Sequence, residues 1–326
     1  MKLISFVTAA GDEPRIGALK DDEIFVDLLA ASQFRDGERP HQFRSMLLFI
    51  QDWRTALDRA YDVFERATDE HCVPLTSVKL LSPLPVPQQM RDCLGFRGHL
   101  ANTLNVANQL AGCSEYNERQ ISMMELSKIK PYWYKCNRFS VCGHDQEIEW
   151  PAYSSIIDYE HELAAVIGRR GRGLSGDEAE RSIFGYTIFN DLSARDVQSD
   201  EMTMFGPTKS KDFDNGNVLG PCIVTCDEFD IGKAVMTCRV NGEIRNVGHA
   251  SDMDHSFPDL ISAISEHETI YPGEIVASGT VTGGSGLDIG RFLEPGDTVE
   301  LEVAGIGKLR NKIVSAGTAG AVAPVG

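Results

Sequence analysis

The chain has 326 residues, which is long enough for two domains and a sizeable core. Its hydrophobic content of 42% and charged content of 24% are typical of a soluble globular protein. The formal net charge is −17 with no basic block, which argues against a nucleic acid or an anionic membrane as partner.

The sequence shows neither the pattern of a membrane-spanning segment nor that of a signal peptide. No apolar run is long enough to cross a bilayer, and the opening MKLISFVTAAGDEP has only a short apolar patch. We therefore expect a cytoplasmic protein without contact to a membrane. The eight cysteines include no Cys-x-x-Cys pair, and no histidine near Cys222 and Cys226 completes a zinc site.

Residues 1–82 are predicted to form a small N-terminal domain. The stretches LISFV and EIFVDL favour short strands, and residues 43–67 carry apolar side chains at helical spacing, which predicts one amphipathic helix. Three prolines between residues 82 and 88 predict an extended connection to the next domain.

Residues 90–315 are predicted to form the larger domain. Residues 101–130 favour helix and a lid over a site, whereas 132–141 and most of the chain after 215 favour strands with tight turns, including a hairpin at Asn241-Gly242. A short helix is expected at 258–266. Because regular βα alternation is missing, the fold class is α+β and mainly β. Residues 316–326 are expected to be a flexible tail.

Two glutamates interrupt an otherwise apolar strand predicted at 156–168, IIDYEHELAAVIG. Glu160 and Glu162 are two residues apart and therefore project from the same face of a strand, whereas His161 projects from the other face. Two buried anions repel each other, and a divalent cation such as Mg²⁺ or Ca²⁺ removes that cost. The alternative is that both glutamates are exposed on an edge strand.

A second polar group follows in FNDLSARDVQ, residues 189–198. Asp191, Arg195 and Gln198 have i, i+4, i+7 spacing, which places them on one face of a helix. They offer either another metal ligand with two donors for an anionic substrate, or an ordinary solvated face with an ion pair.

Nucleotide and serine-hydrolase functions have little support. The Gly-rich loop after Gly283 lacks the third glycine of a dinucleotide fingerprint, and no Gly-Lys-Ser/Thr follows it. The chain also has no Gly-x-Ser-x-Gly nucleophile elbow.

Together, several motifs resemble the fumarylacetoacetate hydrolase family. They occur in order over residues 90–315: RDCLGFRGH, DYEHELAAVIG, FNDLSARDVQ, the lysine of TKSKDFD, SGTVTG and EPGDTVELEVAGIGKLRN. The resemblance implies a mixed β-sandwich roll, a homodimer, a Mg²⁺ cofactor (or Mn²⁺ or Ca²⁺) and a small keto acid substrate.

Carried over position by position, the resemblance implies a role for each matching residue. The metal ligands are Glu160, Glu162, Asp191 and Asp92; the general base is His99, oriented by Glu294; and Lys211, Arg195, Gln198, Tyr134 and Thr280 contact or surround the substrate. Glu294 lies where the resemblance places the orienting carboxylate. This chain departs from many smaller relatives, which carry that glutamate three residues after the histidine, where Asn102 stands here.

The function expected from these residues is hydrolysis of a carbon–carbon bond in a 1,3-diketone or acylpyruvate-type acid, in the breakdown of aromatic or sugar-derived compounds. The cation would polarise the carbonyl and His99 would activate water. Two alternatives remain: a decarboxylase, hydratase or isomerase on the same scaffold, and a catalytically silent metal-stabilised binding protein.

Overall fold

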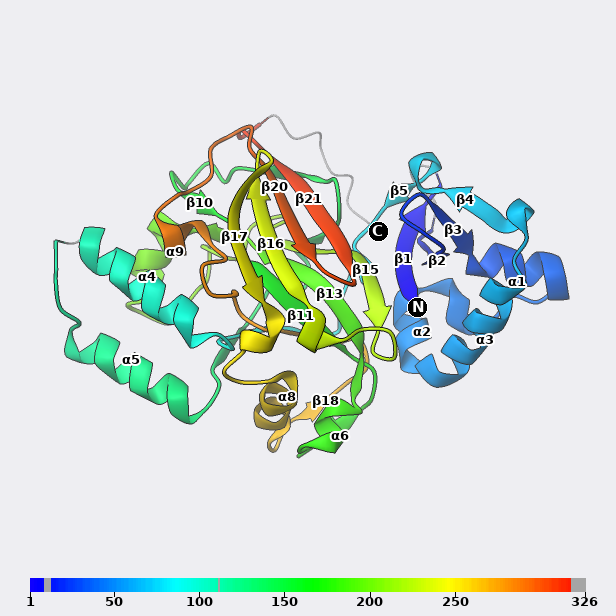
Figure 1. Cartoon of the computed structure of the whole chain (residues 1–326), viewed down its shortest axis with the longest axis horizontal. Helices are drawn as coiled ribbons and strands as arrows, with labels where there is room; N and C mark the ends of the chain where they lie inside the picture. Colours follow the sequence, from blue (N-terminus) through cyan, green and yellow to red (C-terminus); the bar gives the residue numbers. More distant parts are fainter. Residues whose placement is uncertain (9–12, 111, 318–326) are drawn as a thin grey trace.

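A mixed twelve-stranded sheet extends from the N-terminal segment into the rest of the chain in the computed structural model, which describes residues 1–8, 13–110 and 112–317 (Figure 1). In spatial order its strands are β4 (Cys72–Pro74), β3 (Ile24–Asp27), β2 (Arg15–Leu19), β1 (Lys2–Val7), β15 (Asn217–Thr225), β13 (Ile183–Asp191), β11 (His161–Ile167), β19 (Ile275–Ala277), β6 (Met90–Cys93) and β7 (Trp133–Lys135). Two short strands lie off this path: β5 (Lys79–Leu80) pairs with β1, and β8 (Val141–Cys142) pairs with β15.

A second, five-stranded sheet packs on one face of the large sheet. Its order is β17 (Glu243–His249), β16 (Val235–Val240), β20 (Thr298–Val303), β21 (Gly307–Val314) and β9 (Glu147–Glu149). Two ribbons complete the strands: β10 (Ile157–Asp158) with β14 (Ser193–Ala194), and β12 (Gly171–Arg172) with β18 (Thr269–Ile270). The predicted α+β fold with packed mixed sheets is confirmed.

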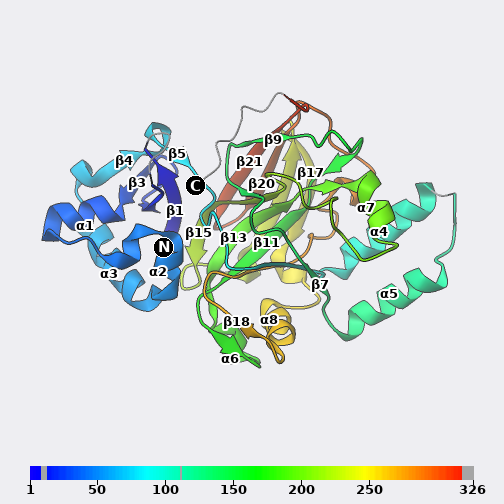
Figure 2. The same ribbon diagram turned by 180° about the vertical axis from the view of Figure 1, so that it is seen from behind.

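Helices surround the sheets on three sides. They are α1 (Leu28–Asp36), α2 (Met46–Gln51) and α3 (Trp53–Glu65) in the N-terminal segment, α4 (Arg97–Leu110) and α5 (Glu118–Ile129) at the opposite end, and α6 (Asp177–Glu180), α7 (Arg195–Glu201), α8 (Phe257–Ser265) and α9 (Gly286–Ile289). Figure 2 shows the same arrangement from behind, with α1–α3 and α4–α5 far apart. Among the described residues, no helix is long and apolar enough to span a bilayer.

Strand β11 is buried on both faces, which explains its continuous apolar sequence. Leu163, Ala165 and Ile167 pack into the core between the two sheets. Ala164 and Val166 pack on the opposite face, in the core that also includes residues of α2 and α3. Glu160 and Glu162 have the parity of this second face, so the alternation of a strand places both carboxylates on the side away from the five-stranded sheet.

Three local predictions differ from the structure. The single helix expected at 43–67 is divided at Asp52, whose φ of −128° and ψ of 40° are not helical. The strand expected at 156–168 is interrupted between β10 and β11. Asp191 is the last residue of β13 rather than part of a helix, because β13 continues up to the turn that leads into α7.

The hairpin predicted at Asn241-Gly242 is confirmed. The two residues connect β16 and β17 with φ values of 52° and 80°, the left-handed conformation that Asn and Gly adopt at least cost. The N-terminal segment is joined to the rest by pairing of β1 with β15, so the boundary at residue 82 stays a prediction. The predicted tail falls largely on 318–326, outside the described residues.

Candidate active site

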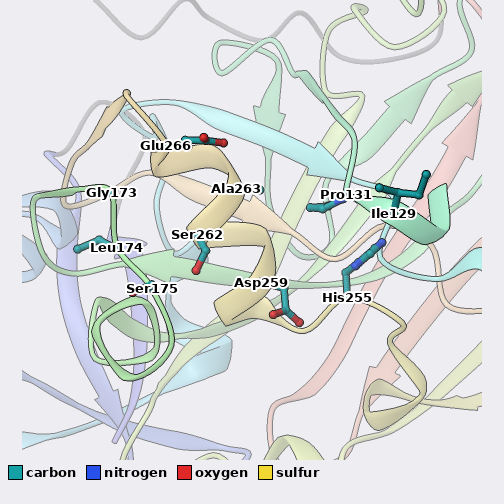
Figure 3. Close-up of a pocket in the computed structure, with 10 residues that line it drawn as sticks. All are labelled: Ile129, Pro131, Gly173, Leu174, Ser175, His255, Asp259, Ser262, Ala263 and Glu266. Atoms are coloured by element: carbon teal, nitrogen blue, oxygen red, sulfur yellow. The ribbon is translucent and has the colours of Figure 1, made fainter. Parts of the chain in front are cut away.

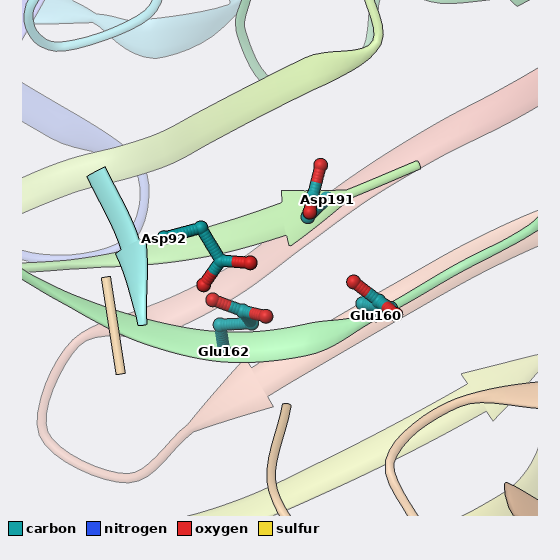
Figure 4. A group of neighbouring side chains, drawn as sticks. All are labelled: Asp92, Glu160, Glu162 and Asp191. Atoms are coloured by element: carbon teal, nitrogen blue, oxygen red, sulfur yellow. The ribbon is translucent and has the colours of Figure 1, made fainter. Parts of the chain in front are cut away.

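Four carboxylates from three strand regions of the large sheet meet at one place. One oxygen from each of Asp92, Glu160, Glu162 and Asp191 lies within 4.8 Å of the other three. Figure 4 shows their side chains pointing toward one another from β6, from β11 and the residue before it, and from the end of β13. All four residues are at most 9% exposed, so the alternative of exposed edge-strand glutamates is wrong.

Burial and mutual repulsion shift the acidity of this cluster. Burial raises the pKa of Asp92 and Glu162 well above the usual range, and the neighbouring carboxylates add to the effect. Burial likewise raises the pKa of Asp191 to about 6. Burial would also raise the pKa of Glu160, but the charges of Lys211 and Arg195 hold it below its usual value.

The cluster fits a hard divalent cation. Oδ1 of Asp92 and Oδ1 of Asp191 are buried and accept no hydrogen bond from the described residues, which leaves oxygen donors directed into the site. Ligation by carboxylate oxygens alone suits Mg²⁺, Mn²⁺ or Ca²⁺ and disfavours softer metals. These four residues are therefore the ones that would hold an ion.

The side chains predicted to contact substrate also hold the carboxylates in place. Nζ of Lys211 lies 2.5 Å from Oε2 of Glu160 and 2.5 Å from Oδ2 of Asp191, where it offsets their charge. The Tyr134 hydroxyl donates to Oδ2 of Asp191 at 2.5 Å. The Thr280 hydroxyl donates to Oε1 of Glu162 at 3.2 Å.

His99 lies at the edge of the cluster and is held by an aspartate. Its Nε2 is 3.8 Å from Oε1 of Glu160, and its Nδ1 is 2.7 Å from Oδ2 of Asp288. The prediction that Glu294 orients His99 is wrong: Glu294 is exposed, and its backbone N–H donates to Asp297. The reason is that the loop after β19 turns into α9, which brings Asp288 to His99 six residues before Glu294 in the sequence.

Asp288 was missed because it lies within the Gly-rich loop. The backbone N–H of Ser285 donates to Oδ2 of Asp288 at 3.2 Å, and the backbone N–H of Asp288 donates to Ser285 Oγ at 3.1 Å, which together form a capping box at the start of α9. The Ser285 hydroxyl also donates to Oδ2 of Asp288, at 2.6 Å. The Ser-x-x-Asp spacing was visible in the sequence, but it signals a helix start and carries no information about a histidine 189 residues away.

Arg195 contacts the same oxygen of Glu160, Oε1, that lies nearest to His99, and Gln198 contacts Arg195. The Arg195 guanidinium is buried, contacts Asp158 and Glu160 at 2.7 Å each, and donates from NH1 to Oε1 of Gln198 at 2.8 Å. The neighbouring Asp196 does not pair with Arg195 and accepts hydrogen bonds from Ser154 and Ser155.

His161 faces the core between the sheets, as its parity predicts. It is fully buried, and burial lowers its pKa to about 3, so the ring is neutral near pH 7. Both ring nitrogens lack a hydrogen-bond partner among the described residues. Lys209, unlike the buried Lys211, lies at the surface, where its ammonium donates to the carbonyl of Asp212.

An open pocket beside α8 is separate from this site (Figure 3). Its lining includes His255, Asp259 and Glu266 but none of the predicted site residues. Nε2 of His255 lies 2.8 Å from the carbonyl oxygen of Ser127, and Asp259 caps α8 by accepting from Ser256. His255 and Asp259 therefore already have structural partners.

Comparison with known sequences identifies the family. The profile described as "Fumarylacetoacetate (FAA) hydrolase C-terminal" matches residues 100–314. The chain belongs to the fumarylacetoacetate hydrolase family. The resemblance inferred from the motifs is thereby confirmed, and the cluster of carboxylates around His99 is the candidate active site of an enzyme of this family.

The relatives of this family member catalyse more than one reaction. This chain is 33% identical over 244 residues to oxaloacetate tautomerase YisK of Bacillus subtilis, and the match covers 73% of this chain and 74% of the relative. It is 30% identical over 318 residues to the mitochondrial oxaloacetate tautomerase Fahd2a of Rattus norvegicus, covering 96% and 92%. The fumarylacetoacetate hydrolase structure from Exiguobacterium antarcticum superposes with a TM-score of 0.71 at 26% identity, covering 97% and 99%.

Proposed function

We propose that this fumarylacetoacetate hydrolase family member is a divalent-metal-dependent hydrolase that cleaves a carbon–carbon bond in a 1,3-diketone or acylpyruvate-type acid. The observation that carries the proposal is the pair of His99 and Asp288, with Nδ1 and Oδ2 2.7 Å apart, at the edge of a four-carboxylate site. A cation held by the four carboxylates would supply Lewis-acid polarisation of the substrate's carbonyl oxygens, and Mg²⁺ is the ion we propose.

His99 supplies the base. Asp288 accepts a hydrogen bond from Nδ1–H, which leaves Nε2 free to accept a proton from water, and the carboxylate stabilises the imidazolium that forms. Nε2 is the nitrogen directed toward the cluster, 3.8 Å from Glu160. General-base catalysis of this kind contributes about 10²- to 10⁴-fold to a rate.

The bond changes balance without a further reactant. The water oxygen forms a bond to the carbonyl carbon, and the carbon–carbon bond then breaks with its electron pair going to the departing enolate. The imidazolium of His99 returns the proton to the enolate carbon, which gives a carboxylic acid and a ketone or 2-oxo acid. Lys211 and Arg195, both buried, offset negative charge on the substrate oxygens during these steps.

A panel of acylpyruvates, 2-oxo diacids and 1,3-diketones tests the proposal in ¹⁸O-labelled water with Mg²⁺ and with EDTA. We expect cleavage products that carry ¹⁸O in the new carboxylate, lost with EDTA and reduced at least 100-fold in His99→Ala. Consumption of substrate without cleavage, or cleavage at wild-type rate in His99→Ala, would overturn the proposal.

The second candidate is keto–enol tautomerisation of a short 2-oxo diacid such as oxaloacetate. It is favoured by the two tautomerase relatives, one of which this chain matches over 96% of its length. The same His99 would then move a proton between carbon and oxygen, with no water added. Tautomerisation would make the enol signal of oxaloacetate decay faster, with no cleavage and no new carboxylate that carries ¹⁸O, and this distinguishes it from hydrolysis.

A further inference from the structure

Asp158 lies at the junction of two parts of the candidate site, yet it is neither a member of the carboxylate cluster nor a partner of His99. It ends β10, two residues before Glu160, and is fully buried. Its carboxylate accepts from four donors: Oδ1 accepts from the backbone N–H of Gly286 at 2.7 Å and of Tyr159 at 2.9 Å, and Oδ2 accepts from Leu287 N–H at 2.9 Å and Arg195 Nε at 2.8 Å.

One side of this carboxylate holds the start of α9. A Cβ on Gly286 would lie 2.3 Å from Oδ1 of Asp158, so only glycine allows the loop to approach so closely. Leu287, which donates to Oδ2, directly precedes Asp288. The position of Asp288, and through it the orientation of His99, therefore depends on the seating of α9 against Asp158.

The other side of the carboxylate holds Arg195. Nε of the guanidinium donates to Oδ2 of Asp158 at 2.8 Å, and NH2 lies 2.7 Å from the same oxygen, so this carboxylate holds the guanidinium in place. In that orientation NH2 also reaches Glu160 at 2.7 Å and NH1 reaches Gln198 at 2.8 Å. A single buried carboxylate thus contacts both the arginine on the substrate side and the loop that supports the base.

We propose that Asp158 is a positioning residue that couples the two halves of the site, the Arg195–Gln198 pair and the His99–Asp288 pair. The kinetic part of this inference rests on the proposed function. Asp158 does not touch the substrate; it acts through Arg195 and through α9. Loss of its charge should therefore disturb substrate binding and proton transfer together.

Asp158→Asn tests this with little change in volume. The amide nitrogen cannot accept, so the variant loses two of the four hydrogen bonds: those from Gly286 and Tyr159 if it replaces Oδ1, or those from Leu287 and Arg195 if it replaces Oδ2. Since hydrogen bonds to a charged group are worth about 1.5–3 kcal/mol, we expect kcat to fall about 10- to 100-fold, with a rise in KM. In a double-mutant cycle with Asp288→Asn the two losses should be clearly less than multiplicative, because both act on His99.

Asp196→Asn is the matched control. Asp196 is the next residue after Arg195 and also accepts four hydrogen bonds, from Ser154, from the backbone and side chain of Ser155, and from Val197. None of these donors belongs to α9 or to Arg195, so Asp196→Asn should keep the kcat and KM of the wild type. Its effect should also combine multiplicatively with that of Asp288→Asn in the double-mutant cycle. Equal effects of the two substitutions, or full multiplicativity for Asp158→Asn, would overturn the proposal.

A measurement without substrate separates this inference from the proposed function. In ¹⁵N-histidine-labelled, metal-free protein, the His99 ring signals, identified by their loss in His99→Gln, should shift in Asp158→Asn and not in Asp196→Asn. If Asp158→Asn does not fold, Gly286→Ala replaces it, because the new Cβ displaces the same contact. Unchanged His99 signals in the folded variant overturn the inference even if the wild-type enzyme turns over no substrate of the panel.

Discussion

Replacing Asp288 by Asn should disable His99 while leaving the fold in place. The Asp288 side chain is fully buried, and its Oδ2 lies 2.7 Å from Nδ1 of His99. An amide that donates to Nδ1 favours the tautomer with the proton on Nε2, the nitrogen that must accept one. Loss of the charged hydrogen bond alone is worth about 1.5–3 kcal/mol, or about 10- to 100-fold in rate. The wrong tautomer removes general-base catalysis as well, so we expect kcat to fall about 10²- to 10⁴-fold.

The assay compares kcat and KM of Asp288→Asn with Glu294→Gln on the best substrate of the panel, at saturating Mg²⁺. Because Glu294 is exposed and does not contact His99, Glu294→Gln should keep wild-type kinetics. Thermal unfolding of both variants checks that the capping box of α9 survives. A larger loss of kcat in Glu294→Gln than in Asp288→Asn would refute the orientation of His99 described above.

Three further predictions concern the metal, the loop before Lys211 and the β16–β17 turn. Mg²⁺ at 100 times its Kd should raise the free energy of unfolding by about 2.7 kcal/mol in a thermal melt. Glu162→Gln should lose most of this increase, and an equal increase in the variant would contradict the four-carboxylate site. Ser210 and Thr208 hydrogen-bond to Glu201 through their side chains and backbone N–H groups, and these bonds lower its pKa to about 2 although its partial burial opposes this. A carboxylate whose pKa is lowered on folding stabilises the folded state above its usual pKa of about 4.5. In denaturant titrations Glu201→Gln should therefore be less stable than the wild type at pH 7, and the difference should shrink as the pH falls toward 2. A difference independent of pH would exclude this linkage. Gly242→Ala should lower the free energy of unfolding by about 1–2 kcal/mol, because the residue has a φ of 80°, and kcat should not change; unchanged stability would argue against the left-handed turn.

The sequence determined which residue types meet in the site and on which face of the strand they lie. Alternation along 160–164 places Glu160 and Glu162 on one face and His161 on the other, because a strand repeats every two residues whatever surrounds it. The hairpin at Asn241-Gly242 follows from local backbone preference in the same way. The motifs then identified the family and the residues that form the carboxylate cluster.

Only the tertiary structure decided which partners these residues take. The spacing of Asp191 and Arg195 suggested one helix, but Asp191 ends β13 and Arg195 begins α7, because burial in the central sheet prevails over helical spacing. The partner of His99 is Asp288 rather than Glu294, and Arg195 pairs with Asp158. These contacts join residues far apart in the chain or in separate elements, and they depend on how the loop after β19 closes over β10. Local sequence specifies a turn or a strand; it does not specify which of two nearby carboxylates the packed loop brings within reach of a histidine.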